Sequence, residues 1–308
     1  MSVPLGAGSG VIPDGAASMR SIPRPLSISF VPIAGLLFFL YRRAFFDMWT
    51  NWNSADSYYS HGALIPLISL GLAWLKRNDF FAAPAGASAL GYAPMIAAAL
   101  LLIASDFLGF GVFGQLSIVP MLAGLSLLLL GRARTRVLWF PLAFLFMMVP
   151  LPGSVVQSIA FRLKIFAADA AVFLVKAAGF PMRLEGSFIH FNDDSLLVGD
   201  VCGGLRSLIA LLAIGVLMAY FSKTRPWAQV MILGMSAPIA VAANVFRIVL
   251  LCVVGYYKGS EFAAGRFHDV SGILIFAVAF VLFFTLEGAL RAFAATKPVE
   301  ETTEPRPS

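Results

Sequence analysis

Charge is scarce in this chain of 308 residues. Only 12% of the residues are Asp, Glu, Lys or Arg, whereas 59% are hydrophobic and the mean hydropathy is +0.87. Soluble globular domains carry about 25% charged residues. The composition therefore excludes a soluble globule and indicates a polytopic membrane protein.

Acidic residues are the rarer of the two signs, and no cluster of them suggests a metal or phosphate site. The chain has 16 Asp and Glu residues against 22 Lys and Arg residues, a net charge of +6. We therefore expect no metal ion and no cofactor. The positive charge falls in connections between apolar segments, as expected for cytoplasmic loops, and does not require a nucleic-acid partner.

Cysteine is nearly absent, with only Cys202 and Cys252 in the chain. Cys252 falls inside an apolar segment and is interpreted as a small core residue. A disulfide between the two would require both to lie at one depth in the membrane. A cleaved signal is not expected either, because residues 1–27 are rich in Gly, Pro and Ser and lack an apolar core of their own.

Long apolar runs dominate the rest of the chain. Windows of about 20 apolar residues predict an all-α membrane protein, a bundle of about eight transmembrane helices. The predicted spans are 28–42, 62–75, 90–108, 113–130, 137–150, 204–221, 227–257 and 271–290. We expect residues 28–293 to form the membrane domain, between a disordered cytoplasmic N-terminus (1–27) and a disordered cytoplasmic tail (294–308).

Basic residues mark every second boundary between the predicted spans, which sets the orientation. They are Arg20, Arg24, Lys76, Arg77, Arg132, Arg134, Arg136, Lys223, Arg225, Arg291 and Lys297. Both termini should therefore be cytoplasmic. The loops that carry Cys202 and His268 should face the periplasm or the exterior.

The segment from Gly153 to Phe180 is amphipathic, and a membrane crossing there would break the alternation of basic loops. We interpret it as a helix in the outer interface, preceded by a break at Pro150 and Pro152. From Met182 to Val201, apolar and polar residues alternate over short stretches, which predicts a small outer β-hairpin that leads to Cys202.

Cys202 opens the sequence Cys-Gly-Gly-Leu-Arg-Ser, where a predicted helix enters the membrane. The N-terminus of a helix stabilises a thiolate. The amides of Gly203 and Gly204 let a substrate carbonyl approach the backbone closely. The surroundings of Cys202 thus suit a nucleophile.

Arg247 lies within a predicted span, where a guanidinium is costly unless it faces a polar cavity. Asn244 is three positions earlier, on the same helical face. Three histidines compete as the base: His61, His190 and His268. His268 is favoured because Asp269 and Gly272 follow it at a helix start, and a Cys–His pair supplies both a nucleophile and a proton donor.

These motifs resemble the bacterial exosortases and the archaeal archaeosortases. The resemblance runs from Tyr59 to Arg291 and rests on motifs in a fixed order: Ser60-His61-Gly62, Phe140-Pro141-Leu142, Pro150-Leu151-Pro152, Gly179-Phe180-Pro181, Glu185-Gly186, the box from Cys202 through Arg206 to Ser207, Asn244 to Arg247, and His268. The sequence departs from many members at Gly203, where they have Ser.

The resemblance implies an integral-membrane cysteine protease or transpeptidase of the bacterial inner membrane, with its site facing the periplasm. It implies Cys202 as nucleophile, His268 as general acid and base, and Arg247 as stabiliser of the tetrahedral intermediate, with Arg206, Asn244, Gly203, Gly204 and His61 in binding or supporting roles. The implied partners are membrane-anchored proteins with a C-terminal sorting signal, made of a Pro-Glu-Pro-type motif, a membrane helix and a basic end. Proteins of an exopolysaccharide system are further partners of this setting.

Other classes of function remain open at this point. A non-catalytic transporter or scaffold for polysaccharide export would also place an Arg within a span, but it does not explain a Cys box, an Arg and a His at one membrane face. A lipid-linked glycosyl or acyl transferase is disfavoured by the missing acidic cluster. Hydrolysis and transfer to an acceptor are equally compatible with the sequence.

Overall fold

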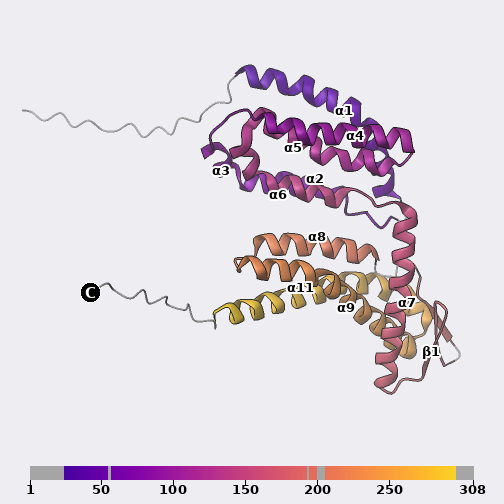
Figure 1. The fold of residues 1–308 in the computed structure, drawn as a ribbon. Helices are drawn as coiled ribbons and strands as arrows, with labels where there is room; N and C mark the ends of the chain where they lie inside the picture. The colour runs from indigo at the N-terminus through magenta and orange to yellow at the C-terminus, as the bar shows by residue number, and fades with distance from the viewer. Residues whose placement is uncertain (1–23, 55–56, 193, 200–204, 296–308) are drawn as a thin grey trace, which may run out of the picture. The chain divides into compact units, whose positions relative to one another are not determined.

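The computed structural model describes residues 24–54, 57–192, 194–199 and 205–295 (Figure 1). The chain divides into two units, Met1–Arg43 and Ala44–Ser308. The described part of the first unit is the beginning of helix α1 (Arg24–Asn53). Every other element, and the whole of the site described below, belongs to the second unit.

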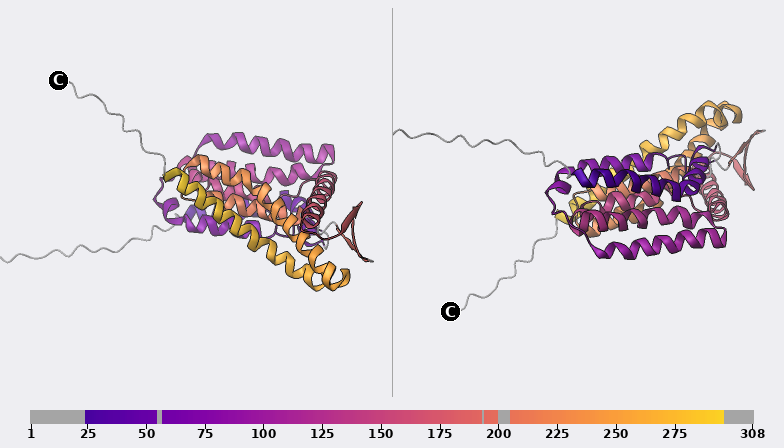
Figure 2. Two further views of the ribbon diagram at one scale, coloured as in Figure 1. Left: turned by 90° about the horizontal axis from the view of Figure 1, so that it is seen from below. Right: turned by 90° about the horizontal axis from the view of Figure 1, so that it is seen from above.

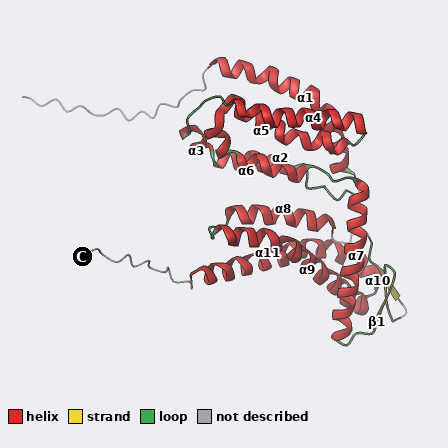
Figure 3. Ribbon diagram, in the orientation of Figure 1, coloured by secondary structure: helices red, strands yellow, loops and turns green. Residues whose placement is uncertain are grey.

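Helices make up most of the second unit (Figure 3). After α1 they are α2 (Leu64–Leu75), α3 (Arg77–Ala82), η1 (Ala89–Gly91), α4 (Tyr92–Leu108), α5 (Gly111–Val137), α6 (Trp139–Phe144), η2 (Leu145–Met148), α7 (Gly153–Ala177), α8 (Leu205–Phe221), α9 (Pro226–Lys258), α10 (Ser260–Ala264) and α11 (Arg266–Ala295). The prediction of a mostly helical membrane protein is thus confirmed.

The count of eight membrane spans is not confirmed. Among the described residues, four helices are long and apolar enough to cross a membrane: Ala89–Leu108, Gly111–Val137, Pro226–Lys258 and Val270–Phe293. A fifth span results if Trp139–Met148 and Gly153–Ala177, which meet at 81°, form one broken span. Two other predicted spans are apolar but short, since α2 has 12 residues and α8 has 17. These helices reach about 18 and 26 Å, less than the 30 Å of a typical hydrocarbon core.

Large apolar side chains cover the outside of these helices. Phe107 is 88% exposed and Ile273 is 76% exposed, and many other Leu, Phe and Trp side chains of the spans are exposed as well. A soluble protein rarely exposes apolar surface on this scale. The fold is therefore that of a multi-pass membrane protein whose outer surface suits lipid.

Close helix contacts depend on small residues. α4 packs along α5, and a Cβ added at Gly124 would lie 2.7 Å from the Gly91 carbonyl oxygen. α8, α9 and α11 run side by side, as the orange to yellow helices of Figure 2 show. A Cβ at Gly215 of α8 would lie 2.6 Å from the Cβ of Ser236 on α9. Small residues let membrane helices approach in this way.

Helix α7 is amphipathic, as its sequence predicts. Its polar residues Gln157, Arg162, Asp169 and Lys176 are exposed, whereas its opposite face is buried and packs against α9 and the sheet. Pro150 and Pro152 separate it from the preceding helix, which explains the sharp bend there. Its location at the outer interface stays a prediction.

A small antiparallel sheet follows α7, with strands β1 (Met182–Glu185), β2 (Phe188–Phe191) and β3 (Asp194–Leu197) in that order. The predicted hairpin is correct for β1 and β2, but it missed β3. The turns contain Gly186 and Asn192, both with positive φ. One face of the sheet, with Ile189 and Phe191, is buried against α7 and α9.

The sheet is joined to the start of α10 through a carboxylate. Asp194 Oδ2 accepts a hydrogen bond from the Ser260 backbone N–H at 2.7 Å, and Oδ1 accepts one from the Ser260 hydroxyl at 2.6 Å. These bonds lower the pKa of Asp194, because they stabilise its charged form. The sheet and the corner between α9 and α11 are thereby held together.

Candidate active site

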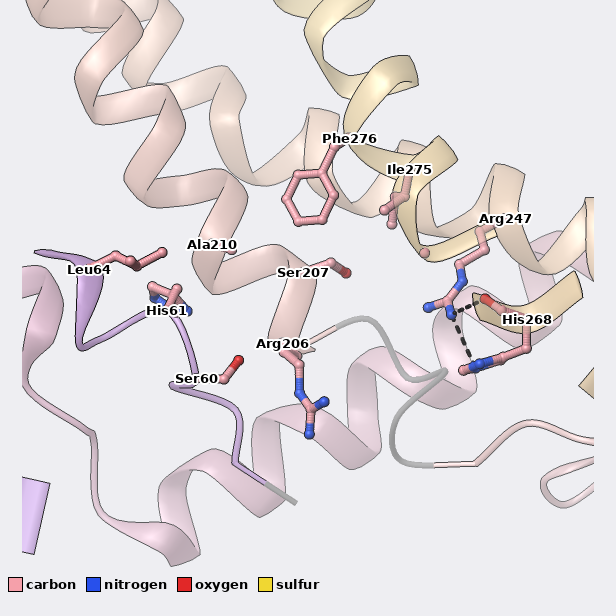
Figure 4. Close-up of a pocket in the computed structure, with 11 residues that line it drawn as sticks. Ser60, His61, Leu64, Arg206, Ser207, Ala210, Arg247, His268, Ile275 and Phe276 are labelled. Carbon is pink, nitrogen blue, oxygen red and sulfur yellow. Dashed lines mark hydrogen bonds between the residues drawn. The ribbon is translucent and has the colours of Figure 1, made fainter. Parts of the chain in front are cut away.

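Arg247 is the buried centre of a hydrogen-bond cluster between α9 and α11. The residue is only 6% exposed. Its Nε donates to the Ser271 hydroxyl at 3.0 Å, and its Nη2 lies 3.1 Å from His268 Nε2 and 3.2 Å from the His268 carbonyl oxygen (Figure 4). The Ser271 hydroxyl in turn donates to the same carbonyl at 2.7 Å. An intramembrane guanidinium is thus balanced by three polar acceptors.

This geometry fixes the tautomer of His268. A guanidinium has only donors, so His268 Nε2 must accept the hydrogen bond from Arg247. The ring is then neutral in this arrangement, with its proton on Nδ1. His268 Nε2 can accept a proton only after its hydrogen bond from the guanidinium is broken.

A cavity of about 480 Å³ opens beside this cluster. That volume lies within the range of about 300 to 1,000 Å³ found for ligand pockets. The described residues that line it are Ser60, His61, Leu64, Arg206, Ser207, Ala210, Arg247, His268, Gly272, Ile275 and Phe276. Four of them are Arg or His and none is Asp or Glu, so the described lining is basic.

His61 forms part of this lining, in the turn before α2. Both of its ring nitrogens are buried, and neither has a hydrogen-bond partner among the described residues. Burial lowers the pKa of His61, which favours the neutral ring. In Figure 4, Ser60 and His61 lie on one side of the start of α8, and Arg247 and His268 lie on the other.

The turn that carries His61 is tightly held. The His61 and Tyr59 rings stack with centroids 6.0 Å apart, and Tyr59 packs against Val156 and Ala160 of α7. Trp52 Nε1 donates to the Met148 carbonyl at 3.0 Å, and its indole lies directly against Gly62. The His61 ring is therefore positioned by its neighbours on both sides.

A comparison with protein families adds to this geometry. Residues 49–285, more than half of the chain, match the family model described as transmembrane exosortase (Exosortase_EpsH). The chain belongs to this exosortase family. No curated protein and no solved structure matches it.

The family match spans every site residue predicted from the sequence. Arg247 and His268 are in contact, and Arg206 and His61 line the same pocket. Cys202, Gly203 and Gly204 lie outside the described residues. Their roles in this exosortase stay predictions.

Two predicted candidates lie apart from the pocket. His190 is on β2, where its Nε2 lies 3.8 Å from Glu185 Oε2, and it lines a separate surface pocket with Lys176 and Arg183. Asn244 is 1% exposed and does not line the cavity, and its amide atoms have no partner among the described residues. His190 is thus separated from the other two histidines, which line one cavity.

Sequence reasoning missed Ser271, which both accepts from Arg247 and donates to His268. It follows His268 by three positions, so the two residues share a helical face. That spacing was a usable signal, but a serine in an apolar helix is common and does not stand out by itself.

Proposed function

We propose that this chain is a membrane cysteine peptidase or transpeptidase that cleaves the C-terminal sorting signal of exported proteins, with Cys202 as its nucleophile. The observation that carries the proposal is the buried contact between Arg247 and His268 beside a cavity lined by the start of α8. Membership of the exosortase family supports the same class of function.

Chain connectivity supports the role of Cys202. It precedes Leu205, the first residue of α8, by three positions, and Arg206 and Ser207 line the cavity. Three residues span at most about 11 Å between Cα atoms. This short connection is compatible with a Cys202 nucleophile that acts at the cavity.

The proposed first half of the reaction forms a thioester. As the substrate carbonyl enters, the Arg247 guanidinium exchanges its bond to His268 Nε2 for one to the developing oxyanion. His268 Nε2 then takes the thiol proton, and Cys202 Sγ attacks the carbonyl carbon. The carbon–nitrogen bond breaks, and His268 passes the proton to the departing amine of the sorting signal.

The second half resolves the thioester. Water gives proteolysis, and an amine or hydroxyl of an acceptor gives transfer; in both cases the thiol of Cys202 is restored. The proposed substrates carry a Pro-Glu-Pro-type motif and a membrane helix, which confines them to the plane of the enzyme and raises their effective concentration. The proposed location is the bacterial inner membrane, with the site on the periplasmic side and exopolysaccharide-system proteins as further partners.

Processing of a co-expressed substrate with such a signal tests the proposal. Cys202→Ala should abolish processing while the variant still accumulates in the membrane. Cys252→Ala is the matched control and should process normally, although it removes a fully buried core thiol. Normal processing by the Cys202→Ala protein, at equal enzyme level, would reject the cysteine mechanism and favour the transporter or scaffold function.

A further inference from the structure

The cavity presents a second imidazole that the mechanism above does not use. His61 and His268 line the same space from different segments, the turn before α2 and the beginning of α11. His268 Nε2 is engaged by Arg247. Both nitrogens of His61 are buried without a partner among the described residues.

Such a group needs an explanation. A buried polar atom that lacks a hydrogen bond is destabilising, so unpaired buried nitrogens are rare unless a ligand or water satisfies them. His61 also belongs to a turn held by Tyr59 and Trp52, so its position is set by the fold. His61 thus lies at the edge of a cavity of ligand size, and its burial lowers its pKa, which favours the neutral ring.

We propose that His61 is the base that takes the proton of the incoming nucleophile, water or an acceptor amine or hydroxyl, in the second half of the reaction. This inference rests on the proposed cysteine mechanism. The two histidines lie on opposite sides of the start of α8, the end of that helix nearest Cys202 (Figure 4). In this proposal the cleaved C-terminal sorting signal leaves on the His268 side of the helix, and the acceptor arrives on the His61 side.

The step balances without any further reactant. The lone pair of the nucleophile forms a bond to the thioester carbonyl carbon, and its proton passes to a ring nitrogen of His61. The carbon–sulfur bond breaks with its electron pair on Cys202 Sγ. The His61 imidazolium then gives its proton to the Cys202 thiolate, so both side chains return to their starting state.

The contact of Arg247 with His268 explains why a different histidine would act in each half of the reaction. Once the first tetrahedral intermediate has collapsed, the guanidinium is again available to His268 Nε2, as in the arrangement observed. His268 must break that bond to accept a proton, whereas His61 has no such bond among the described residues. The ring nitrogens of His61, which no described residue engages, are thus available to the nucleophile of the second step.

The test is accumulation of the thioester. His61→Gln is expressed with a substrate carrying the sorting signal, and the covalent enzyme–substrate adduct is measured on a non-reducing gel, with and without hydroxylamine, which cleaves thioesters. We expect the adduct to accumulate and product release to slow about 100-fold, the lower range of a general base. His190→Gln, which changes a histidine outside the cavity, is the matched control and should release product normally.

Two results would overturn the inference. One is product release by His61→Gln at the wild-type rate. The other is accumulation of uncut substrate without an adduct, which would mean that His61 acts in the first step or has only a structural role. His61→Asn takes its place if the Gln variant does not accumulate in the membrane. Failure of the proposed function is distinguishable, because then the Cys202→Ala protein would process substrate normally and no variant would form a hydroxylamine-sensitive adduct.

Discussion

Arg247 Nη2 lies 3.1 Å from His268 Nε2, and this contact joins the second half of α9 to the first turn of α11. Because a guanidinium can only donate, the contact sets the tautomer of the imidazole and couples the two side chains. An event that draws the guanidinium away, such as formation of an oxyanion, releases the imidazole to accept a proton. The pair therefore links charge stabilisation to proton transfer.

Arg247→Lys should be nearly as damaging as loss of the side chain, although it keeps the positive charge. The guanidinium donates to Ser271 through Nε and to His268 through Nη2 at the same time, a planar fork that a single ammonium does not reproduce. We expect substrate processing to fall about 100-fold or more, the effect of losing one oxyanion donor.

The measurement is the ratio of processed to uncut substrate at equal enzyme level. Ser271→Ala is the matched control, since it removes the Nε acceptor and the hydroxyl that donates to the His268 carbonyl, but leaves the contact of Arg247 with the His268 ring. The loss of substrate processing in Ser271→Ala should be much smaller than the loss in Arg247→Lys. Equal activities of wild type and Arg247→Lys would show that charge alone suffices.

Residue types and their spacing predicted most of the site. Arg247 stood out because a guanidinium is expensive in an apolar helix, and His268 stood out because it opens the next helix. Their contact across 21 positions of sequence depends on the packing of α9 against α11, which no local pattern encodes. The separation of His190 from the cavity is equally a matter of tertiary structure.

The parts of the fold with long apolar segments could be predicted from the sequence, whereas the shorter elements were harder to predict. The long apolar segments of α4, α5, α9 and α11 were correctly placed, and the bend at Pro150 and Pro152 followed from proline chemistry. Strand β3 was not recognised as a separate strand, because each of the three strands has only four residues and the alternation is too short to give their number. Hydropathy also cannot tell a short apolar helix such as α2 from a full span.

The Asp194 carboxylate should contribute to stability only in its charged form. Hydrogen bonds from Ser260 and Ser195 lower its pKa in the folded protein. Between that lowered pKa and the ordinary value of about 3.9, the unfolded chain binds more protons than the folded protein. The contribution of the carboxylate to the stability of the fold is therefore complete above about pH 4 and is lost as the pH falls below 4. Acid titration of thermal unfolding in detergent should show a shallower loss of stability below pH 4 for Asp194→Asn than for the wild type. Parallel acid curves for the two proteins would contradict the proposed role of this carboxylate.

The orientation in the membrane gives an independent prediction. Reporters fused after Arg77, Arg136 or Lys223 should be cytoplasmic, because basic residues near helix ends resist translocation. A reporter placed in the turn at Gly186, between β1 and β2, should be periplasmic. A cytoplasmic signal from that turn would invert the orientation and put the cavity on the wrong side for exported substrates.

The position of His61 should depend on the glycine that follows it. A Cβ at Gly62 would lie 2.8 Å from Trp52 Cε2, and the indole is itself fixed by its bond to the Met148 carbonyl. Gly62→Ala must therefore displace the turn or the indole, at a cost of about 1 to 3 kcal/mol in the free energy of unfolding. Gly71→Ala in α2 is the matched control, because nothing lies within 4 Å of its added methyl group. Thermal unfolding and substrate processing, measured on both variants, should show losses for Gly62→Ala alone; unchanged processing by a destabilised Gly62→Ala protein would mean that the placement of His61 does not limit the reaction.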